Sequence, residues 1–195
     1  MWDEEYSVDE YVYGTEPNDF LASMTDRLKQ GRVLCLAEGE GRNAVHLARH
    51  GFQPTAVDSS RVGLAKAERL AKEGGVAIET VLADLADYTI GEDSWDSIIS
   101  ISCHLPPHLR KNVHRDVVTG LKNGGTLLLE AYTPRQLEFG TGGPPRAEMM
   151  MELETLREEL AGLEFLHGVE LVRNVIEGTN HTGKGSVVQV LARKP

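Results

Sequence analysis

Strand-like and helical patterns alternate along most of this 195-residue chain, which predicts an α/β fold built on a seven-stranded, mainly parallel sheet with helices on both faces. Two further observations support this class. A glycine-rich turn joins a strand to a helix near residue 40, and two β-rich runs close the chain. We therefore expect one α/β domain that ends in an antiparallel β-hairpin.

Short apolar runs bounded by glycine, proline or polar clusters mark five strands, and longer runs with helical periodicity lie between them. We expect strands at 32–37, 54–57, 77–82, 95–101 and 125–132, and helices at 43–50, 60–73, 107–121 and 146–160. An earlier helix begins within PNDFLASMTDRL, where Asn18 or Asp19 is a suitable cap. The closing hairpin is expected to pair 165–178 with 186–194 through the turn GTNHTGKG.

The composition disfavours several classes of protein. Thirty acidic residues against twenty basic ones give a net charge of −10 at pH 7, which opposes binding to a phosphate backbone, so we expect no direct nucleic-acid partner. No apolar run approaches the ~18 residues of a membrane span, and the N-terminus is acidic where a secretion signal is basic. We therefore expect a soluble, cytoplasmic protein. Cys35 and Cys103 lie far apart in strand-like runs, which predicts neither a disulfide nor a metal site.

The turn after the first strand reads EGEGRNA, from Glu38 to Ala44, and matches G-x-G-x-x-A. Such a turn lets the backbone approach a ligand closely, and a dinucleotide is one candidate. However, Glu38 and Glu40 place carboxylates beside the site, and each like-charge contact at about 4 Å costs a phosphate roughly 4 kcal/mol at an effective dielectric of about 20. A cationic ligand would be attracted, unless both glutamates face solvent and merely complement the helix dipole.

Residues that directly follow the other strands are further candidate ligand contacts, because open parallel sheets bind ligands beyond the carboxyl ends of their strands. Asp58 follows the second strand, nineteen positions after Gly39, where a carboxylate can accept both hydroxyls of a ribose. Asp84 and Leu85 follow the third strand, where the carboxylate can accept an adenine amine while the leucine flanks the ring. Helix capping is the alternative role for both aspartates.

The segment SISCHLPP follows the fourth strand. We expect the backbone around Ile101 and Ser102 to line the ligand and His104 to face the reacting group as a candidate general base. The alternative for His104 is a hydrogen-bonded residue in the wall of the site.

The glycine turn, Asp58, Asp84 and the segment after the fourth strand together resemble one enzyme family, the class I S-adenosylmethionine-dependent methyltransferases. Within that class, four segments are similar to the small tellurite-resistance type: YVYGTEPNDFL, VLCLAEGEGRNAVHLA, AVDSS and LEAYTP. The resemblance implies a Rossmann-like fold and S-adenosylmethionine as the cofactor. This cofactor has an ammonium and a sulfonium and no phosphate, which agrees with the glutamates of the turn.

The resemblance also implies roles for the matched residues. It places the two turn glycines against the methionine part of the cofactor, Asp58 on the ribose and Asp84 at the adenine. The family commonly has an aspartate where Cys35 stands, and we hypothesise that Glu38 replaces some of that charge. The expected cofactor contacts are Tyr13, Glu38, Gly39, Gly41, Asn43, Asp58, Ser59, Asp84, Leu85, Ile101 and Ser102.

Two segments are candidates to complete the substrate side. The stretch EAYTPRQLEFGTGGPPRAEMM has the glycine and proline content of an irregular loop, and it makes Tyr132 and Arg135 catalytic candidates beside His104. A surface salt bridge is the alternative for Arg135. The tyrosine-rich N-terminal segment is expected either to fold over the cofactor with Tyr13 or to pack on the sheet.

These expectations describe a single methyltransferase domain over 1–195, in which 1–31 covers the cofactor, 32–132 binds it, and 133–195 supplies the substrate loop, a helix and the closing hairpin. In-line methyl transfer depends on alignment and desolvation, so it needs no dedicated acid–base pair. We expect a small-molecule acceptor, such as a thiol or a tellurite- or selenite-like oxyanion. Two alternatives stay open. One is an NAD-type oxidoreductase, and the other is a cofactor-binding regulator or a subunit that needs a small activating protein partner to methylate protein or tRNA. A homodimer is the other expected form of association.

Overall fold

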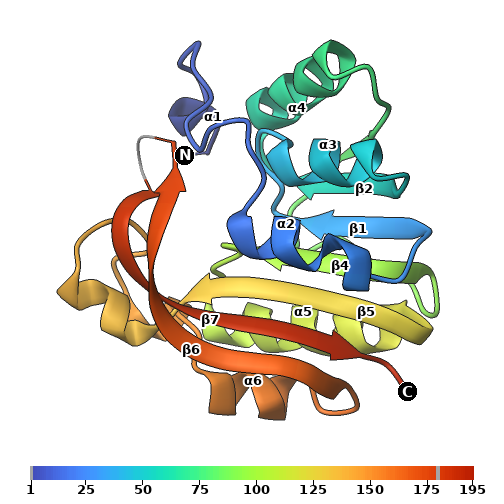
Figure 1. Ribbon diagram of the computed structural model, residues 1–195, viewed down its shortest axis with the longest axis vertical. Helices are drawn as coiled ribbons and strands as arrows, with labels where there is room; N and C mark the ends of the chain where they lie inside the picture. Colours follow the sequence, from blue (N-terminus) through green and yellow to red (C-terminus); the bar gives the residue numbers. More distant parts are fainter. Residues whose placement is uncertain (1, 179–180) are drawn as a thin grey trace.

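The computed structural model describes residues 2–178 and 181–195 and shows a seven-stranded sheet in the order β3-β2-β1-β4-β5-β7-β6 (Figure 1). Strands β1 to β5 run parallel, and β7 pairs antiparallel with both β5 and β6. The predicted fold class is confirmed. The strands are β1 (Arg32–Leu36), β2 (Gln53–Asp58), β3 (Glu79–Leu82), β4 (Trp95–Ile101), β5 (Leu121–Tyr132), β6 (Glu164–Glu177) and β7 (His181–Arg193).

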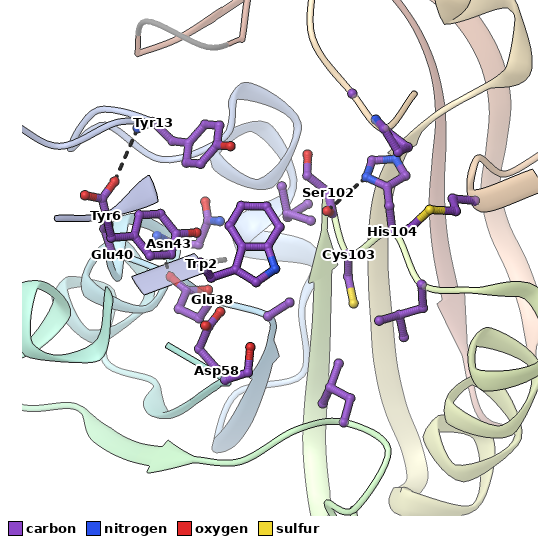
Figure 2. Close-up of a pocket in the computed structure, with 18 of the residues that line it drawn as sticks. Trp2, Tyr6, Tyr13, Glu38, Glu40, Asn43, Asp58, Ser102, Cys103 and His104 are labelled. Carbon is purple, nitrogen blue, oxygen red and sulfur yellow. Dashed lines mark hydrogen bonds between the residues drawn. The ribbon is translucent and has the colours of Figure 1, made fainter. Parts of the chain in front are cut away.

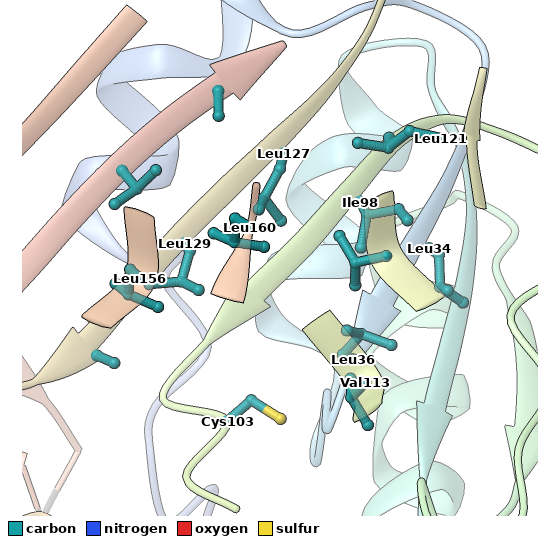
Figure 3. Packing of buried hydrophobic residues seen from close by; sticks show 14 of the residues in the cluster. Leu34, Leu36, Ile98, Cys103, Val113, Leu121, Leu127, Leu129, Leu156 and Leu160 are labelled. Carbon is teal, nitrogen blue, oxygen red and sulfur yellow. The ribbon is translucent and has the colours of Figure 1, made fainter. Parts of the chain in front are cut away.

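Helices cover both faces of this sheet because successive side chains of its buried strands point to opposite sides. In β1, Val33 and Cys35 pack with α2, α3 and α4, while Leu34 and Leu36 pack with α5 and α6 in the larger cluster shown in Figure 3. The helices are α1 (Trp2–Glu5), α2 (Asp19–Met24), α3 (Arg42–Arg49), α4 (Arg61–Glu73), α5 (Pro107–Gly120) and α6 (Leu153–Glu159), with short 3-10 turns at Thr25–Arg27, Pro134–Glu138 and Ala147–Met149. The predicted cap of α2 is confirmed, since the side chain of Asn18 accepts a hydrogen bond from the N–H of Leu21 at 3.0 Å.

The continuous helix predicted at 146–160 is wrong in its first half. A 3-10 turn covers Ala147–Met149, residues 150–152 lie outside any helix, and α6 begins only at Leu153. Two long-range contacts explain the break. The N–H of Met151 donates to the carbonyl of Tyr132 at 2.9 Å, and the carbonyl of Met150 accepts a hydrogen bond from Arg110 at 3.0 Å. These backbone groups are therefore hydrogen-bonded to the end of β5 and to α5 rather than within a helix.

The hairpin is longer than predicted, because 181–185 belong to β7 instead of forming a turn. These residues pair with 173–177 of β6, and the rest of the predicted turn at 179–180 lies outside the described residues. The extra length brings the end of the hairpin to the N-terminal segment, where Gly178 packs against the backbone of Val12 and Tyr13. A side chain at 178 would come within 2.0 Å of the carbonyl oxygen of Val12.

A buried ion pair fastens α6 and the segment before it to α5. Arg110 donates to both carboxylate oxygens of Glu159 at 2.9 and 3.0 Å, and His114 lies 2.7 Å from the same group. Burial alone would raise the pKa of Glu159, but the hydrogen bonds from His114 and Arg110 outweigh it and lower that pKa to about 2. The resulting stabilisation is present above the ordinary pKa of 4.5 and is lost as the pH falls towards 2.

We predict that Arg110→Leu lowers the free energy of unfolding by about 3 kcal/mol, because it leaves the carboxylate of Glu159 buried without its main partner. Urea denaturation at pH 7 measures this loss. The control is Arg115→Leu on the same helix, whose side chain is 68% exposed. If the two variants are equally stable, the ion pair does not hold α6 in place.

Candidate active site

A cavity of about 630 Å³ lies beyond the carboxyl ends of the parallel strands. Its lining includes Glu38 after β1, Asp58 at the end of β2, Asp84 after β3, and Ser102 and His104 after β4. Strand β1 lies between β2 and β4, so the strand order reverses at this point. Open α/β sheets bind their ligands at such a reversal, and the structure places the candidate site there.

Glu38 occupies the start of α3. Its Oε1 accepts hydrogen bonds from the N–H groups of Asn43 at 2.9 Å and Ala44 at 2.8 Å. The backbone reaches this position through positive φ angles at Ala37 (49°) and Gly39 (62°). The carboxylate therefore fills the place where a helix N-terminus would otherwise hold a phosphate. Burial raises the pKa of Glu38 to about 7, so this group ionises near neutral pH.

Glu40 has a different role, because its charge is already compensated. Lys66 on α4 donates to Oε1 at 2.8 Å, and the backbone N–H of Tyr13 donates to Oε2 at 3.3 Å. Both members of the ion pair are buried. Of the two glutamates in the turn, Glu38 is thus the one with charge available to a ligand, while Glu40 fastens the N-terminal segment to the site.

The two turn glycines make close packing possible but do not line the cavity. A Cβ at Gly39 would lie 2.6 Å from the hydroxyl of Tyr6, and one at Gly41 would lie 2.5 Å from the Cβ of Ala67. Both glycines also have positive φ angles, of 62° and 88°. Tyr6 and α4 thus cover the sides on which a side chain would lie, and the expected contact of these two glycines with the cofactor stays a prediction.

Asp58 lines the cavity and also holds the turn together. Its Oδ2 accepts from the N–H of Gly39 at 2.8 Å, and its Oδ1 accepts from the N–H of Ser60 at 2.8 Å. Burial raises the pKa of Asp58 above its ordinary value. Asp84 likewise accepts from the N–H of Ala86 at 2.9 Å. Capping and turn contacts are thus present for both aspartates, and both still face the cavity.

The structure brings nine of the expected cofactor contacts to this one cavity. Asn43 is held by its Oδ1, which accepts from the N–H of Asn18 at 3.0 Å. Ser102 has a positive φ of 54° that turns the chain after β4 towards the cavity. The nine are Tyr13, Glu38, Asn43, Asp58, Ser59, Asp84, Leu85, Ile101 and Ser102.

His104 also lines the cavity, but both of its ring nitrogens are engaged with backbone. The N–H of Tyr132 donates to Nε2 at 3.0 Å, so Nε2 is an acceptor, and Nδ1 carries the proton that it donates to the carbonyl of Ser102 at 3.0 Å. This arrangement fixes a neutral ring as part of the wall. It supports the wall role over the general-base role, since the lone pair that would accept a proton is already used.

The other two catalytic candidates do not reach the cavity. The ring of Tyr132 is buried beneath Gly143 and stacks on His104, with 5.7 Å between ring centroids. Arg135 is 62% exposed and pairs with Glu138 on the surface, which is its predicted alternative role. The loop that follows β5 contributes Arg146 and Met149 instead, together with residues 143–145. Sequence patterns gave no reason to choose Arg146 over Arg135, because both lie in the same irregular loop.

A buried polar network joins the hairpin to the first turn of α3. Glu177 on β6 accepts from Arg42 at 2.7 Å and from the side chain of Asn18 at 2.7 Å. Asn18 also donates to Glu130 on β5 at 2.7 Å, and Arg173 is ion-paired with the same glutamate. Two arginines balance two glutamates here, so the cavity-lining guanidinium of Arg42 is neutralised within the protein.

Comparisons with known proteins agree with this geometry. Residues 33–125 match the family model described as a methyltransferase domain. The uncharacterized methyltransferase YbaJ of Bacillus subtilis (strain 168) is 28% identical over 115 residues, which are 58% of this chain and 45% of that protein. The matched part is therefore less than half the length of this relative.

Solved structures share the fold. TehB from Haemophilus influenzae has a TM-score of 0.74 at 22% identity, over 91% of this chain and 62% of that one. A protein from work on the conversion of a disulfide bond into a thioacetal group during echinomycin biosynthesis has a TM-score of 0.78 at 21% identity, over 98% and 87%. A SAM-dependent methyltransferase from Methanosarcina mazei has a TM-score of 0.68 at 17% identity, over 85% and 93%. At these identities the likeness establishes the fold.

The family match over residues 33–125 supports a methyltransferase domain, and the fold is similar to that of TehB. S-adenosylmethionine is the cofactor that this assignment implies. The cavity fits it in charge, because carboxylates line one side and the nearby Arg42 is neutralised by Glu177. It also fits in size, since sites for small molecules and cofactors span about 300–1,000 Å³. None of the described helices is long and apolar enough to cross a membrane.

We predict that Glu38→Gln weakens S-adenosylmethionine binding at pH 8 by at least about tenfold, which corresponds to about 1.4 kcal/mol. A charge pair at about 4 Å contributes roughly 4 kcal/mol at an effective dielectric of about 20, so the expected loss is a fraction of that energy. Calorimetric titration measures the Kd. Because the pKa of Glu38 is raised from 4.5 to about 7 in the folded state, stability falls as the pH rises from about 4.5 to 7 and the loss is complete at pH 8. The variant should therefore be at least as stable as the wild type at pH 8. Unchanged affinity would show that another group supplies the charge.

Proposed function

We propose that this protein transfers the methyl group of S-adenosylmethionine to a small acceptor that arrives with a nucleophilic lone pair, such as a thiolate or a selenite- or tellurite-like oxyanion. The observation that carries this proposal is the contrast between the two sides of the cavity in Figure 2. One side presents carboxylates that attract a cation. The other presents His104 and Cys103, neither of which suits proton removal at neutral pH.

Two observations indicate that neither His104 nor Cys103, two of the described residues on the acceptor side, acts as a base. His104 uses both ring nitrogens on backbone groups. Burial, assisted by the charge of Asp58, raises the pKa of the Cys103 thiol to about 12. An acceptor that had to lose a proton during the reaction would find no partner in either group. A soft nucleophile that is already anionic needs none.

Arg146 gives such an acceptor a matching charge. Arg146 lines the cavity with a largely exposed side chain, and its contact with Glu148 is 3.5 Å long with both side chains in solvent. A pair of this kind contributes little, so the guanidinium can turn towards an anion at small cost. Arg42 differs because Glu177 holds it at 2.7 Å in a buried contact.

The bound cofactor would supply the transferable methyl group, and the chain would supply alignment and exclusion of water. We propose that the segment 1–31 covers the cofactor, that 32–132 binds it, and that 133–195 shapes the acceptor side with the loop at 143–149. Leu105 and Met149 add apolar surface there, which suits a polarisable acceptor atom.

The proposal predicts a selective acceptor profile. With S-adenosylmethionine at pH 7.5, we expect formation of S-adenosylhomocysteine in the presence of small thiols, selenite or tellurite, and none with alkyl alcohols, which would need a base. Chromatographic measurement of S-adenosylhomocysteine gives the result. Turnover confined to alcohols would contradict the proposal.

We also predict that Arg146→Gln raises the KM for an anionic acceptor roughly tenfold, the loss expected for about 1.4 kcal/mol of charge-assisted hydrogen bonding, with kcat within about twofold. The matched control is Arg135→Gln in the same loop, which lies outside the cavity and should leave both constants unchanged. Equal effects of the two substitutions would remove Arg146 from the acceptor site.

A further inference from the structure

The N-terminal segment places three aromatic rings in the wall of the cavity. Trp2 stacks on Tyr6 with 5.8 Å between ring centroids and 22° between planes, and Tyr6 meets Tyr13 edge-on at 6.3 Å. All three line the cavity. Figure 2 shows them on the same side as Glu38 and Asp58, opposite Ser102, Cys103 and His104.

This aromatic wall, formed by Trp2, Tyr6 and Tyr13, is fastened to the protein at both ends. The carboxylate of Asp3 accepts from the hydroxyl of Ser60 at 2.6 Å and from the N–H of Val62 at 3.2 Å, which attaches α1 to the start of α4. Further along, the N–H of Tyr13 donates to Glu40. The rings are thus fixed in place relative to the glycine turn.

The core of the protein also leaves room for this wall. A Cβ at Gly39 would lie 2.6 Å from the hydroxyl of Tyr6, and a Cβ at Gly63 on α4 would lie 2.9 Å from Cδ2 of the same ring. Two glycines, one in the glycine turn and one in the first turn of α4, therefore accommodate Tyr6.

The electrostatic character of the wall suits a cation. The face of an aromatic ring carries negative charge density and attracts cations, most strongly for tryptophan. The rings stand beside the carboxylates of Glu38 and Asp58, which have the same preference. Burial and the charge of Asp58 raise the pKa of the Tyr6 phenol, so this side chain stays protonated and adds no charge of its own.

We propose that the aromatic wall recognises the positive charge of the bound methyl donor and so distinguishes the donor from its neutral product. The inference rests on the proposed function, because the charge difference arises from methyl transfer. The acceptor's lone pair forms the new bond to the methyl carbon, the carbon–sulfur bond breaks, and its electron pair stays on sulfur. The sulfonium becomes a neutral thioether, which the rings and carboxylates hold less strongly, and product release is favoured.

Calorimetric titration with three ligands tests this inference. They are S-adenosylmethionine, sinefungin, which carries an ammonium in place of the methylsulfonium, and the neutral product S-adenosylhomocysteine. The variants are Trp2→Leu and Trp2→Phe. Trp2 is 44% exposed, so neither change should prevent folding. Trp2→Phe keeps a ring and is the matched control for the loss of aromatic character.

We expect Trp2→Leu to raise the Kd of both cationic ligands about 5- to 30-fold and that of the neutral product less than about threefold, while Trp2→Phe gives smaller changes in the same direction. Equal weakening of charged and neutral ligands, or equal effects of Leu and Phe, would overturn the inference and leave the proposed function standing. Failure of the wild-type protein to bind any of the three ligands would overturn both.

Discussion

The two hydrogen bonds from the N–H groups of Asn43 and Ala44 to the carboxylate of Glu38 determine what this site can bind. They fill the start of α3 from within the protein, so an external phosphate has neither donors nor a favourable field there. They also hold a buried negative charge at the edge of the cavity. The raised pKa of Glu38 shows that this charge destabilises the folded protein. A cationic cofactor offsets that destabilisation when it binds. The charge preference of the site thus follows from one side chain and one helix end.

Segments distant in the sequence converge on this turn through polar contacts. Asp58 holds the N–H of Gly39, and Glu40 ties the N-terminal segment to α4 through Lys66. Asn18 and Glu177 bring in α2 and the hairpin, whose end lies close to the N-terminal segment in Figure 1. The carboxylates of Glu40 and Glu177 are buried and paired with Lys66 and Arg42, so these contacts restrict geometry without adding net charge. The same arrangement leaves Glu38 and Asp58 as carboxylates whose charge faces the ligand.

Periodicity predicted much of this structure, because each βα unit is specified by local signals. The strand at 95–101 was predicted as observed, and the cap at Asn18 is one of the two residues predicted for it. The break before α6 was missed because it depends on a hydrogen bond between Met151 and Tyr132, which no local pattern encodes. For the site, nine of the expected cofactor contacts line one cavity, and their binding roles stay predictions. Trp2 and Tyr6 were missed as cavity residues because their position depends on long-range contacts that attach the N-terminal segment to α4. Arg135 was chosen over Arg146 because the sequence does not reveal the path of the irregular loop that holds both.

Parallel calorimetric titration of the wild-type protein with S-adenosylmethionine and NAD at pH 8 tests the central claim most directly. Both ligands carry an adenosine, but only NAD carries a pyrophosphate and only S-adenosylmethionine carries a sulfonium. A carboxylate at the start of α3 predicts saturable binding of S-adenosylmethionine and no measurable binding of NAD. Saturable binding of NAD with none of S-adenosylmethionine would contradict the account, because it would require Glu38 to leave the N–H groups that it occupies.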